Sequence, residues 1–295
     1  MTLRDALVLG RVSNLPTVWT NTLVGLVLTG GTAGDIRILP LLLALSLFYL
    51  GGMYLNDAFD AGLDAVERPE RPIPSGRIGR GSVFALGFAM LGGGLALLLW
   101  LGLGIAGGTG YWPAAAGLAL AAAILFYDWH HKNNPLSPLV MGLCRVLVYV
   151  TAGLSVAVPL PATLWLGAGA LLCYLIGLTY IAKQENLARI ANLWPLGFLA
   201  APMAYGAVLI AGQPWTALPW LALPWLALIA WMARALWFLR RRGPGDIPRA
   251  VTSLLAGICL LDAVLIAGAG APGLAFLAVL AFPVTVMFQR YVPAT

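Results

Sequence analysis

Three aspartates stand at regular spacing at the end of a long apolar segment. The spacing i, i+3, i+7 relates Asp57, Asp60 and Asp64. In a helix this spacing places the three carboxylates on one stripe, with neighbours about one turn apart. Negative charges held this close repel one another unless a cation lies between them, and oxygen ligands without cysteine or histidine suit Mg²⁺. The pattern predicts a magnesium site in which the preceding Asn56 supports the aspartates.

The segment that follows the aspartates is basic. It contains four arginines, Arg68, Arg71, Arg77 and Arg80. Guanidinium groups match the geometry of phosphate oxygens, so the combined stretch predicts a magnesium–diphosphate site at a membrane surface. The alternative is a solvated loop in which acids balance arginines, but such a loop gives no reason for acids at one-turn spacing beside an apolar segment.

The composition excludes an ordinary soluble protein. Hydrophobic residues make up 61% of the chain and charged residues 9%, whereas soluble domains carry about 25% charged residues. Crossing a bilayer takes roughly 20 apolar residues in a helix. We therefore predict an all-α polytopic membrane protein in which residues 1–295 form a single integral-membrane domain with nine to ten transmembrane helices. The expected spans are Leu7–Gly30, Ile38–Ala58, Val83–Ile105, Tyr111–Tyr127, Leu139–Val158, Leu164–Ala182, Leu193–Ala211, Leu218–Leu239, Val251–Ala267 and, as a tenth, Leu274–Phe288.

Basic residues mark alternate connections between these spans. The positive-inside rule then places both termini and the aspartate-rich stretch on the cytoplasmic side of a bacterial-type cytoplasmic membrane. The same bias accounts for the net charge of +6, so the sequence gives no reason to expect a nucleic-acid partner.

The aspartate-rich stretch has the ordered pattern N-D-x-x-D-x-x-x-D, followed by R-P-I-P-S-G-R-I. It resembles the first aspartate-rich motif of the UbiA superfamily of intramembrane prenyltransferases. The segment R-V-S-N-L-P near the N-terminus and the connection Y-D-W-H-H-K at 127–132 extend the resemblance. It implies helices around a central lateral cavity, and a first motif that binds a prenyl diphosphate through Mg²⁺. It also implies transfer of the prenyl group to an aromatic or other small acceptor, with release of pyrophosphate.

The chain departs from that family at the second motif, which usually reads D-x-x-x-D after the sixth span. The equivalent stretch, residues 179–192, contains no aspartate and resembles a divergent branch seen in EboC-like proteins. Glu185 and Asn186 could supply oxygen ligands to a second metal, and Lys183 could bind the diphosphate directly. The alternative is a surface helix in which Glu185 pairs with Arg189.

Further candidates come from the other spans. The resemblance places Tyr127 and Lys132 near the diphosphate, whereas the adjacent His130 and His131 point to different helix faces and are expected at ordinary interface positions. Arg145 lies inside a span and is expected to face the cavity, because a buried cation needs an anion or water. A substrate anion or the Asp128 carboxylate could be the partner of Arg145.

Two other polar positions are less specific. Arg11 and Asn14 share a helix face and either reach the site or serve snorkelling and helix packing. Asp262 is expected to bond to a neighbouring helix. The predicted catalytic residues are Asp57, Asp60, Asp64 and Lys132, the diphosphate-binding residues Arg71, Tyr127, Lys132, Lys183, Asn14 and Arg145, and the metal ligands Asn56, Asp57, Asp60, Asp64, Glu185 and Asn186.

Prenyl transfer is an ionisation problem, because the breaking C–O bond leaves charge on the departing pyrophosphate. Magnesium and cationic side chains stabilise that charge more in the transition state than in the ground state. The expected partners are a prenyl diphosphate, a small acceptor and membrane lipid, with no obligate protein partner. Two alternatives remain, a terpene cyclase of the same family and a non-catalytic protein that binds or transports polyprenyl phosphate.

Overall fold

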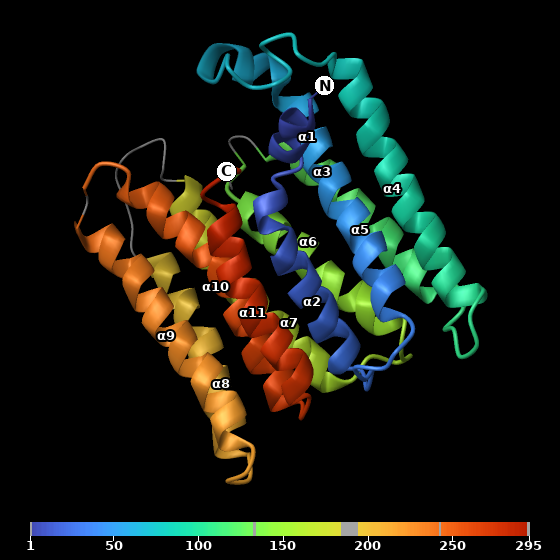
Figure 1. The fold of residues 1–295 in the computed structure, drawn as a ribbon, viewed down its shortest axis with the longest axis vertical. Coiled ribbons are helices and arrows are strands. Elements are labelled where there is room, and N and C mark those ends of the chain that lie inside the picture. Colours follow the sequence, from blue (N-terminus) through green and yellow to red (C-terminus); the bar gives the residue numbers. More distant parts are fainter. Residues whose placement is uncertain (1, 132–133, 184–193, 242, 294–295) are drawn as a thin grey trace.

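The computed structural model describes residues 2–131, 134–183, 194–241 and 243–293, and within these ranges it contains helices and no strands. The all-α prediction is therefore confirmed. The helices, shown in Figure 1, are α1 (Leu3–Leu9), the 3₁₀ helix η1 (Val12–Asn14), α2 (Leu15–Val27), α3 (Ile38–Glu67), α4 (Arg80–Leu103), α5 (Trp112–His130), α6 (Ser137–Leu154), α7 (Ala162–Lys183), the 3₁₀ helix η2 (Trp194–Leu199), α8 (Ala200–Ala211), α9 (Leu218–Arg241), α10 (Asp246–Gly268) and α11 (Pro272–Phe288).

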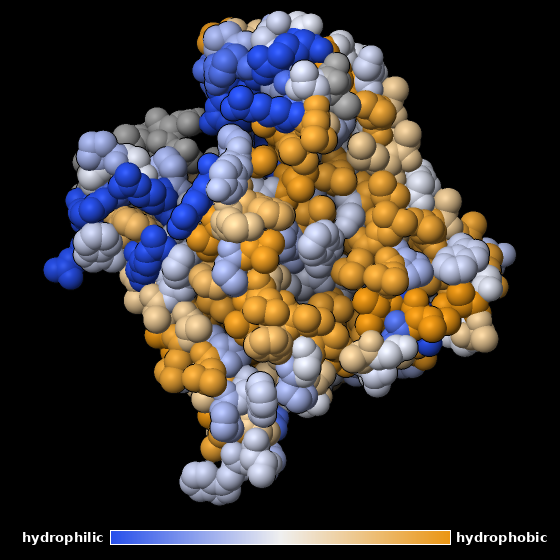
Figure 2. Space-filling model, viewed as in Figure 1, coloured by the Kyte–Doolittle hydropathy of each residue, from blue (hydrophilic) through white to orange (hydrophobic). Residues whose placement is uncertain are grey.

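Seven of the described helices are long and apolar enough to cross a membrane, namely α3, α4, α5, α6, α7, α9 and α10. The segment Leu196–Ala211 and helix α11 are shorter apolar helices. In Figure 2 hydrophobic side chains cover the middle of the molecule, while hydrophilic ones gather at one end. The chain is an integral membrane protein.

The first expected span, Leu7–Gly30, is not continuous. Helix α1 ends at Leu9, and the chain resumes as η1 and α2. The break lies at Arg11, whose φ of 40° puts it in the left-handed region that β-carbon-bearing residues seldom adopt. A hydrophobicity pattern alone does not detect such a break, because apolar residues continue on both sides of it.

Helix α3 extends well beyond the apolar segment from which it was predicted. It runs 30 residues to Glu67, and a helix of that length measures about 45 Å, more than the hydrocarbon core of roughly 30 Å. The aspartates therefore stand on helical turns beyond the apolar part of α3. Helix α4 packs closely against α3 at Gly87, where no larger residue would fit. A Cβ added there would lie only 2.6 Å from Leu55 Cγ of α3.

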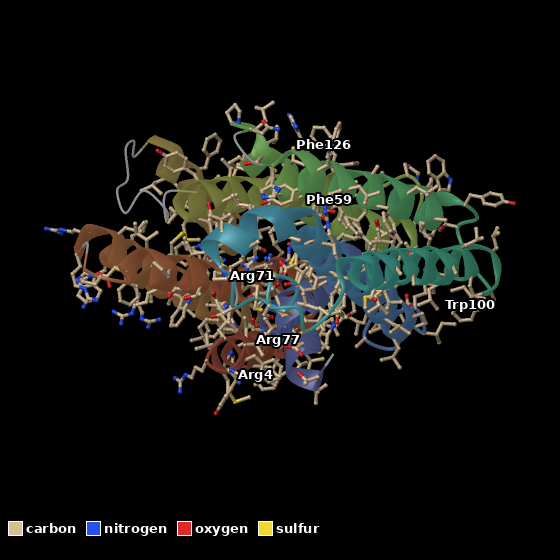
Figure 3. All side chains as sticks on the ribbon, turned by 90° about the horizontal axis from the view of Figure 1, so that it is seen from above. Arg4, Phe59, Arg71, Arg77, Trp100 and Phe126 are labelled. Atoms are coloured by element: carbon tan, nitrogen blue, oxygen red, sulfur yellow. The ribbon has the colours of Figure 1, made fainter. Side chains whose placement is uncertain are left out.

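Helix α10 forms the centre of the other half of the bundle. It packs against α2, α7, α9 and α11, and 94% of its most apolar stretch is buried. A helix that is apolar on all sides suits such a position. Both chain ends lie in the upper part of Figure 1, on the side where the hydrophilic residues gather in Figure 2. Figure 3 looks down on this polar end, with Arg71 and Arg77 over the middle of the bundle.

Candidate active site

Two of the three aspartates converge on a single nitrogen atom. Arg71 Nη1 lies 2.8 Å from Asp64 Oδ2 and 3.4 Å from Asp57 Oδ1. Both aspartates are buried, and their separation of seven residues, two helical turns, places them on the same face of α3. Two members of the predicted carboxylate stripe, Asp57 and Asp64, therefore share one face, and a guanidinium lies between them.

The turn after α3 brings Arg71 back over the aspartates. The backbone N–H of Arg68 donates to Asp64 O, and that of Ser75 donates to Arg71 O. Gly76 has a φ of 74°, which favours glycine and lets the chain reverse toward α4. The sequence R-P-I-P-S-G thus folds as a compact turn that returns the arginine to the helix it follows.

The other arginines of this stretch that have described contacts bind elsewhere. Arg77 Nε donates to Asp5 Oδ1 at 2.9 Å, and Arg80 Nε donates to the carbonyl oxygen of Ala58 at 2.8 Å. Arg80 also lies over the Phe84 ring, with 5.4 Å between its Cζ and the ring centroid. The Arg77 contact joins α1 to the segment between α3 and α4, and the Arg80 contact joins the start of α4 to α3.

Arg11 is a further cation at the site, and the left-handed break in the chain turns its side chain toward α3. Its Nη2 donates to Asp57 Oδ1 at 3.0 Å and to Asn56 Oδ1 at 3.2 Å, and its Nη1 approaches Met53 Sδ at 3.4 Å. Of the two sequence-based interpretations of Arg11, the structure favours the one that brings it to the aspartates.

Asp60 points toward helix α5 instead. His131 Nε2 lies 3.6 Å from Asp60 Oδ2, and His131 Nδ1 lies 3.1 Å from the carbonyl oxygen of Tyr127. The Tyr127 and His131 rings stack with centroids 4.9 Å apart. The sequence predicts an ordinary interface position for His131, whereas in the structure its ring lies beside Asp60. Its spacing of four residues from Tyr127 was the available signal.

Asn56 links the acidic cluster to the cavity. Its Nδ2 donates to Asp128 Oδ1 at 3.1 Å, while its Oδ1 accepts from Arg11. Asp128 is buried, so it is not a surface charge, and its Oδ2 has no hydrogen-bond partner among the described residues. A buried carboxylate oxygen without a partner is costly and suits a bound cation or an incoming donor.

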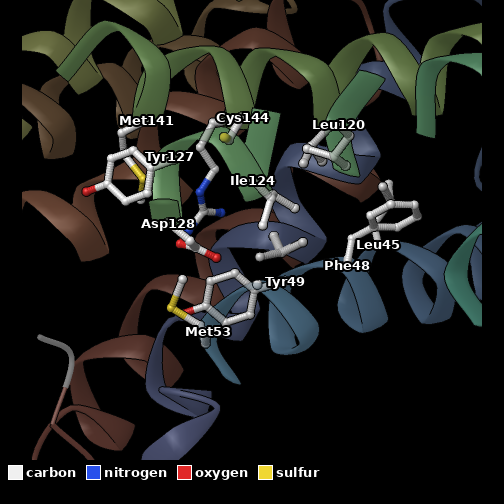
Figure 4. A pocket seen from close by; sticks show the side chains of 14 residues that line it. Leu45, Phe48, Tyr49, Met53, Leu120, Ile124, Tyr127, Asp128, Met141 and Cys144 are labelled. Atoms are coloured by element: carbon white, nitrogen blue, oxygen red, sulfur yellow. The ribbon is translucent and has the colours of Figure 1, made fainter. Parts of the chain in front are cut away.

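An apolar cavity adjoins this cluster, in agreement with the cavity that the family resemblance predicts. Figure 4 shows Tyr127, Asp128, Tyr49 and Met53 toward one end of it, and Leu45, Phe48 and Leu120 toward the other. Helices α2, α3, α5 and α6 provide its walls. The remaining lining residues are Val18, Gly52, Ile124, Met141, Cys144, Arg145 and Val148.

Arg145 faces this cavity, as predicted. It is buried, its Nη1 donates to Asn21 Oδ1 at 3.1 Å, and its Cζ lies 5.4 Å from the centroid of the Tyr49 ring. In the described part of the chain, its hydrogen bond goes to Asn21 and not to Asp128. The guanidinium is thereby held at the polar end of an apolar space.

Asp262 supports Arg145 through Asn21. It is fully buried and accepts hydrogen bonds from Asn21 Nδ2 at 2.8 Å and from the hydroxyl groups of Thr20 and Tyr149. The expectation that it bonds to neighbouring helices is confirmed. Because Asn21 donates to Asp262 with its nitrogen, its oxygen is directed to Arg145.

The other predicted residues fall into two groups. Asn14 is buried at the end of η1 and accepts a hydrogen bond from Gln289 Nε2 at 3.3 Å. Lys132, Glu185, Asn186 and the side chain of Lys183 lie outside the described residues, so their proposed roles stay predictions.

The residues present suit Mg²⁺ in their chemistry. No three Asp, Glu, His or Cys side chains in the described ranges are grouped closely enough to hold a metal by themselves. Mg²⁺ does not require such a group, because it commonly takes one or two carboxylates and completes its shell with phosphate oxygens and water. Asp57 and Asp64 already share one cationic nitrogen, and Asp128 offers an unpartnered oxygen nearby.

The fold and the site together define a polytopic all-α membrane protein with an acidic and basic cluster beside an apolar cavity. The sequence pattern of the UbiA prenyltransferase family matches residues 18–258, so the chain belongs to this family. Among curated proteins, digeranylgeranylglyceryl phosphate synthase of Methanopyrus kandleri is 36% identical over 161 residues, which cover 53% of this chain and 53% of that protein. Protoheme IX farnesyltransferase of Korarchaeum cryptofilum is 37% identical over 118 residues, covering 38% of this chain and 37% of that protein.

The chain thus spans about half or less of the length of these curated relatives. A solved structure from work on digeranylgeranylglyceryl phosphate synthase in membranes matches with a TM-score of 0.60 and 18% identity. The match covers 90% of this chain and 98% of that one, and at this identity it shows the fold alone.

Proposed function

We propose that this chain transfers a prenyl group from a prenyl diphosphate to a small acceptor inside the membrane, with Mg²⁺ as cofactor and pyrophosphate as the second product. One observation supports this most strongly. Two buried aspartates of α3 converge on Arg71, and hydrogen bonds through Arg11 and Asn56 connect Asp57 to Asp128 at the polar end of an apolar cavity. This arrangement suits a ligand with a charged head and an apolar tail.

The aspartates would hold the metal, with Asn56 as support. Asp57 and Asp64 face a common point, and Asp60 would contribute from the neighbouring turn. Bound Mg²⁺ would supply positive charge where negative charge grows on the leaving pyrophosphate. Glu185 and Asn186 remain candidate ligands for a second metal.

The arginines and lysines would hold the diphosphate oxygens. Arg71 and Arg11 already lie against the carboxylates that would bind the metal. A guanidinium beside a metal-bound phosphate donates charge-assisted hydrogen bonds that shorten and strengthen as charge develops. Lys132, Lys183, Asn14 and Tyr127 are proposed to complete this shell.

The cavity would hold the prenyl tail and exclude water from the allylic cation. Its walls are mainly Leu, Ile, Val, Met and Phe side chains, and the rings of Tyr49 and Tyr127 stand at its polar end. Aromatic faces attract a nearby cation, and a dry environment prevents its capture by water. The chain's own contribution is thus to orient the tail and shield the reacting carbon.

Arg145 is proposed to hold the acceptor. It is a buried guanidinium that faces the cavity and is paired with a neutral amide, so it retains a full positive charge to offer to a carboxylate or phosphate. The similar curated proteins carry names with different products, a digeranylgeranylglyceryl phosphate and a farnesylated protoheme IX. The acceptor is therefore proposed at the level of a small anionic or aromatic molecule.

The setting is proposed to be a single integral-membrane domain, residues 1–295, in a bacterial-type cytoplasmic membrane with its site on the cytoplasmic side. The basic residues in alternate connections between the spans support this orientation through the positive-inside rule. Surrounding lipid is the expected partner, and neither a nucleic acid nor an obligate protein partner is proposed.

Pyrophosphate release tests this proposal. Purified protein is supplied with Mg²⁺ and prenyl diphosphates of several lengths, with and without a panel of small acceptors. Prenylated product with stoichiometric pyrophosphate supports transfer. A cyclised product without any acceptor would instead indicate the cyclase, and tight binding without pyrophosphate release across the panel would indicate a carrier.

A further inference from the structure

A second hollow lies at the polar end of the bundle, between the end of α9, the start of α10 and the end of α11. Its volume is about 530 Å³. None of its lining residues lines the apolar cavity described above. The hollow is lined by Trp231, Arg234, Phe238, Arg241, Arg249, Thr252, Ser253, Val286, Gln289 and Arg290.

The hollow carries excess positive charge. Four arginines line it and no acidic side chain does. Asp246, just outside, accepts a hydrogen bond from Arg241 Nε at 2.8 Å, and Arg249 Nη1 lies 3.4 Å from its Oδ1. One carboxylate therefore serves two of the arginines, and the described ion pairs leave Arg234 and Arg290 available to an outside anion.

Aromatic rings orient the arginines before any ligand arrives. Arg234 Cζ lies 4.3 Å from the Trp231 ring centroid and 5.2 Å from that of Phe238. The Trp231 indole is itself fixed, because its Nε1 donates to the carbonyl oxygen of Ser253 on α10 at 2.7 Å. A guanidinium held in place loses less side-chain entropy when it binds, which favours affinity.

The position of the hollow points to a ligand from the membrane. Helices α9 and α10 are both candidate membrane spans, and the hollow lies at their polar ends, where Figure 2 shows hydrophilic residues. Apolar side chains of Trp231, Phe238 and Val286 line the same space as the arginines. Basic pockets between transmembrane helices on the cytoplasmic side bind phospholipid head groups.

We propose that this hollow binds the phosphate head group of an anionic phospholipid, with Arg234 and Arg290 as its principal contacts. The shared chemistry is a phosphate anion, and the apolar lining favours a lipid over free phosphate because part of an acyl chain can cover it. The inference does not depend on prenyl transfer. It concerns residues outside the proposed catalytic cluster.

Native mass spectrometry of the full-length protein tests the proposal. The protein is exchanged from detergent into mixed phosphatidylglycerol and phosphatidylcholine, and the retained lipid is counted. Wild type is expected to retain one phosphatidylglycerol in preference to phosphatidylcholine. Because each arginine near a membrane surface contributes about 1 kcal/mol toward anionic lipid, Arg234→Gln with Arg290→Gln is expected to weaken retention about 30-fold.

Matched variants distinguish the hollow from general charge. Arg4→Gln with Arg240→Gln removes the same charge from two exposed arginines that do not line the hollow, and it is expected to leave retention unchanged. Thr252→Glu places a carboxylate among the arginines. It is expected to abolish retention without loss of thermal stability, so that a folding defect in the double variant leaves the test intact.

A separate arm compares the sources of phosphate. Inorganic phosphate at 1 mM is expected not to displace the retained lipid, because free phosphate lacks the affinity that contact of an acyl chain with the apolar lining adds. Displacement by phosphate alone, equal loss in the control variant, or equal retention of phosphatidylcholine would each overturn the proposal.

Discussion

Removal of Arg71 should destabilise the protein in the absence of metal, because one guanidinium nitrogen lies against two buried carboxylates. Breaking a buried ion pair by removing one partner costs about 3–5 kcal/mol. The Arg71 side chain is 15% exposed, and Arg11 still pairs with Asp57, so we expect the lower end, about 3 kcal/mol for Arg71→Ala. The free energy of unfolding in a detergent titration measures it.

Addition of Mg²⁺ should reverse part of that loss. In Arg71→Ala the two carboxylates keep their positions on α3 but lack their shared cation, so a divalent cation gains affinity there. We expect millimolar Mg²⁺ to stabilise Arg71→Ala more than wild type, by about 1–2 kcal/mol when the Mg²⁺ concentration is about ten to thirty times the Kd.

Two controls make the prediction specific. Arg77→Ala removes an ion pair in which the arginine is 48% exposed, and it should cost no more than about 1 kcal/mol. Arg71→Ala combined with Asp64→Asn should lose the response to Mg²⁺. The reasoning is refuted if Arg71→Ala is as stable as wild type, or if Mg²⁺ stabilises both proteins equally.

Three further predictions concern the surroundings of the site. Asp262→Ala leaves three buried hydrogen-bond donors without the carboxylate that accepts from them, which should cost about 2–3 kcal/mol of unfolding free energy. It should also raise KM for the prenyl acceptor, because Asn21 is no longer held against Arg145, and an unchanged KM would contradict the role of the Asn21–Arg145 contact. His131→Phe keeps an aromatic ring and removes the contact between His131 Nε2 and Asp60, so turnover of the prenyl diphosphate should fall by about tenfold or more while thermal stability stays close to wild type. Steady-state kinetics equal to those of wild type would refute this role. Hydrogen bonds from the backbone N–H and the hydroxyl of Thr2, together with Arg77, lower the pKa of Asp5, so its stabilisation is present above the ordinary carboxyl pKa and is lost as the pH falls through the lowered value. The difference in unfolding free energy between wild type and Asp5→Asn should therefore shrink as the pH falls through that range, and a constant difference would argue against it.

The sequence predicted the parts of the site that depend on local periodicity. Asp57 and Asp64 are two turns apart on one helix, so their common face follows from spacing alone. The family resemblance contributed the expectation of a cavity.

The contacts that escaped sequence analysis join residues far apart in the chain. Arg11 reaches Asp57 because of a left-handed residue whose conformation no hydrophobicity pattern reveals. The partners of Asp262 lie on α2 and α6, more than one hundred residues away. Such pairings depend on which helices pack together, and the local pattern of a single sequence does not predict that.

The most direct test of the account is the position of the metal. Crystals or cryo-EM samples of the protein are prepared with Mn²⁺ in place of Mg²⁺ and a non-hydrolysable prenyl diphosphate, and the anomalous or density peak is located. The account predicts a cation bound by carboxylate oxygens of Asp57 and Asp64, with Arg71 on the diphosphate and the prenyl chain in the cavity beside Tyr127. A diphosphate and metal bound elsewhere, with Arg71 still paired to both aspartates, would contradict it.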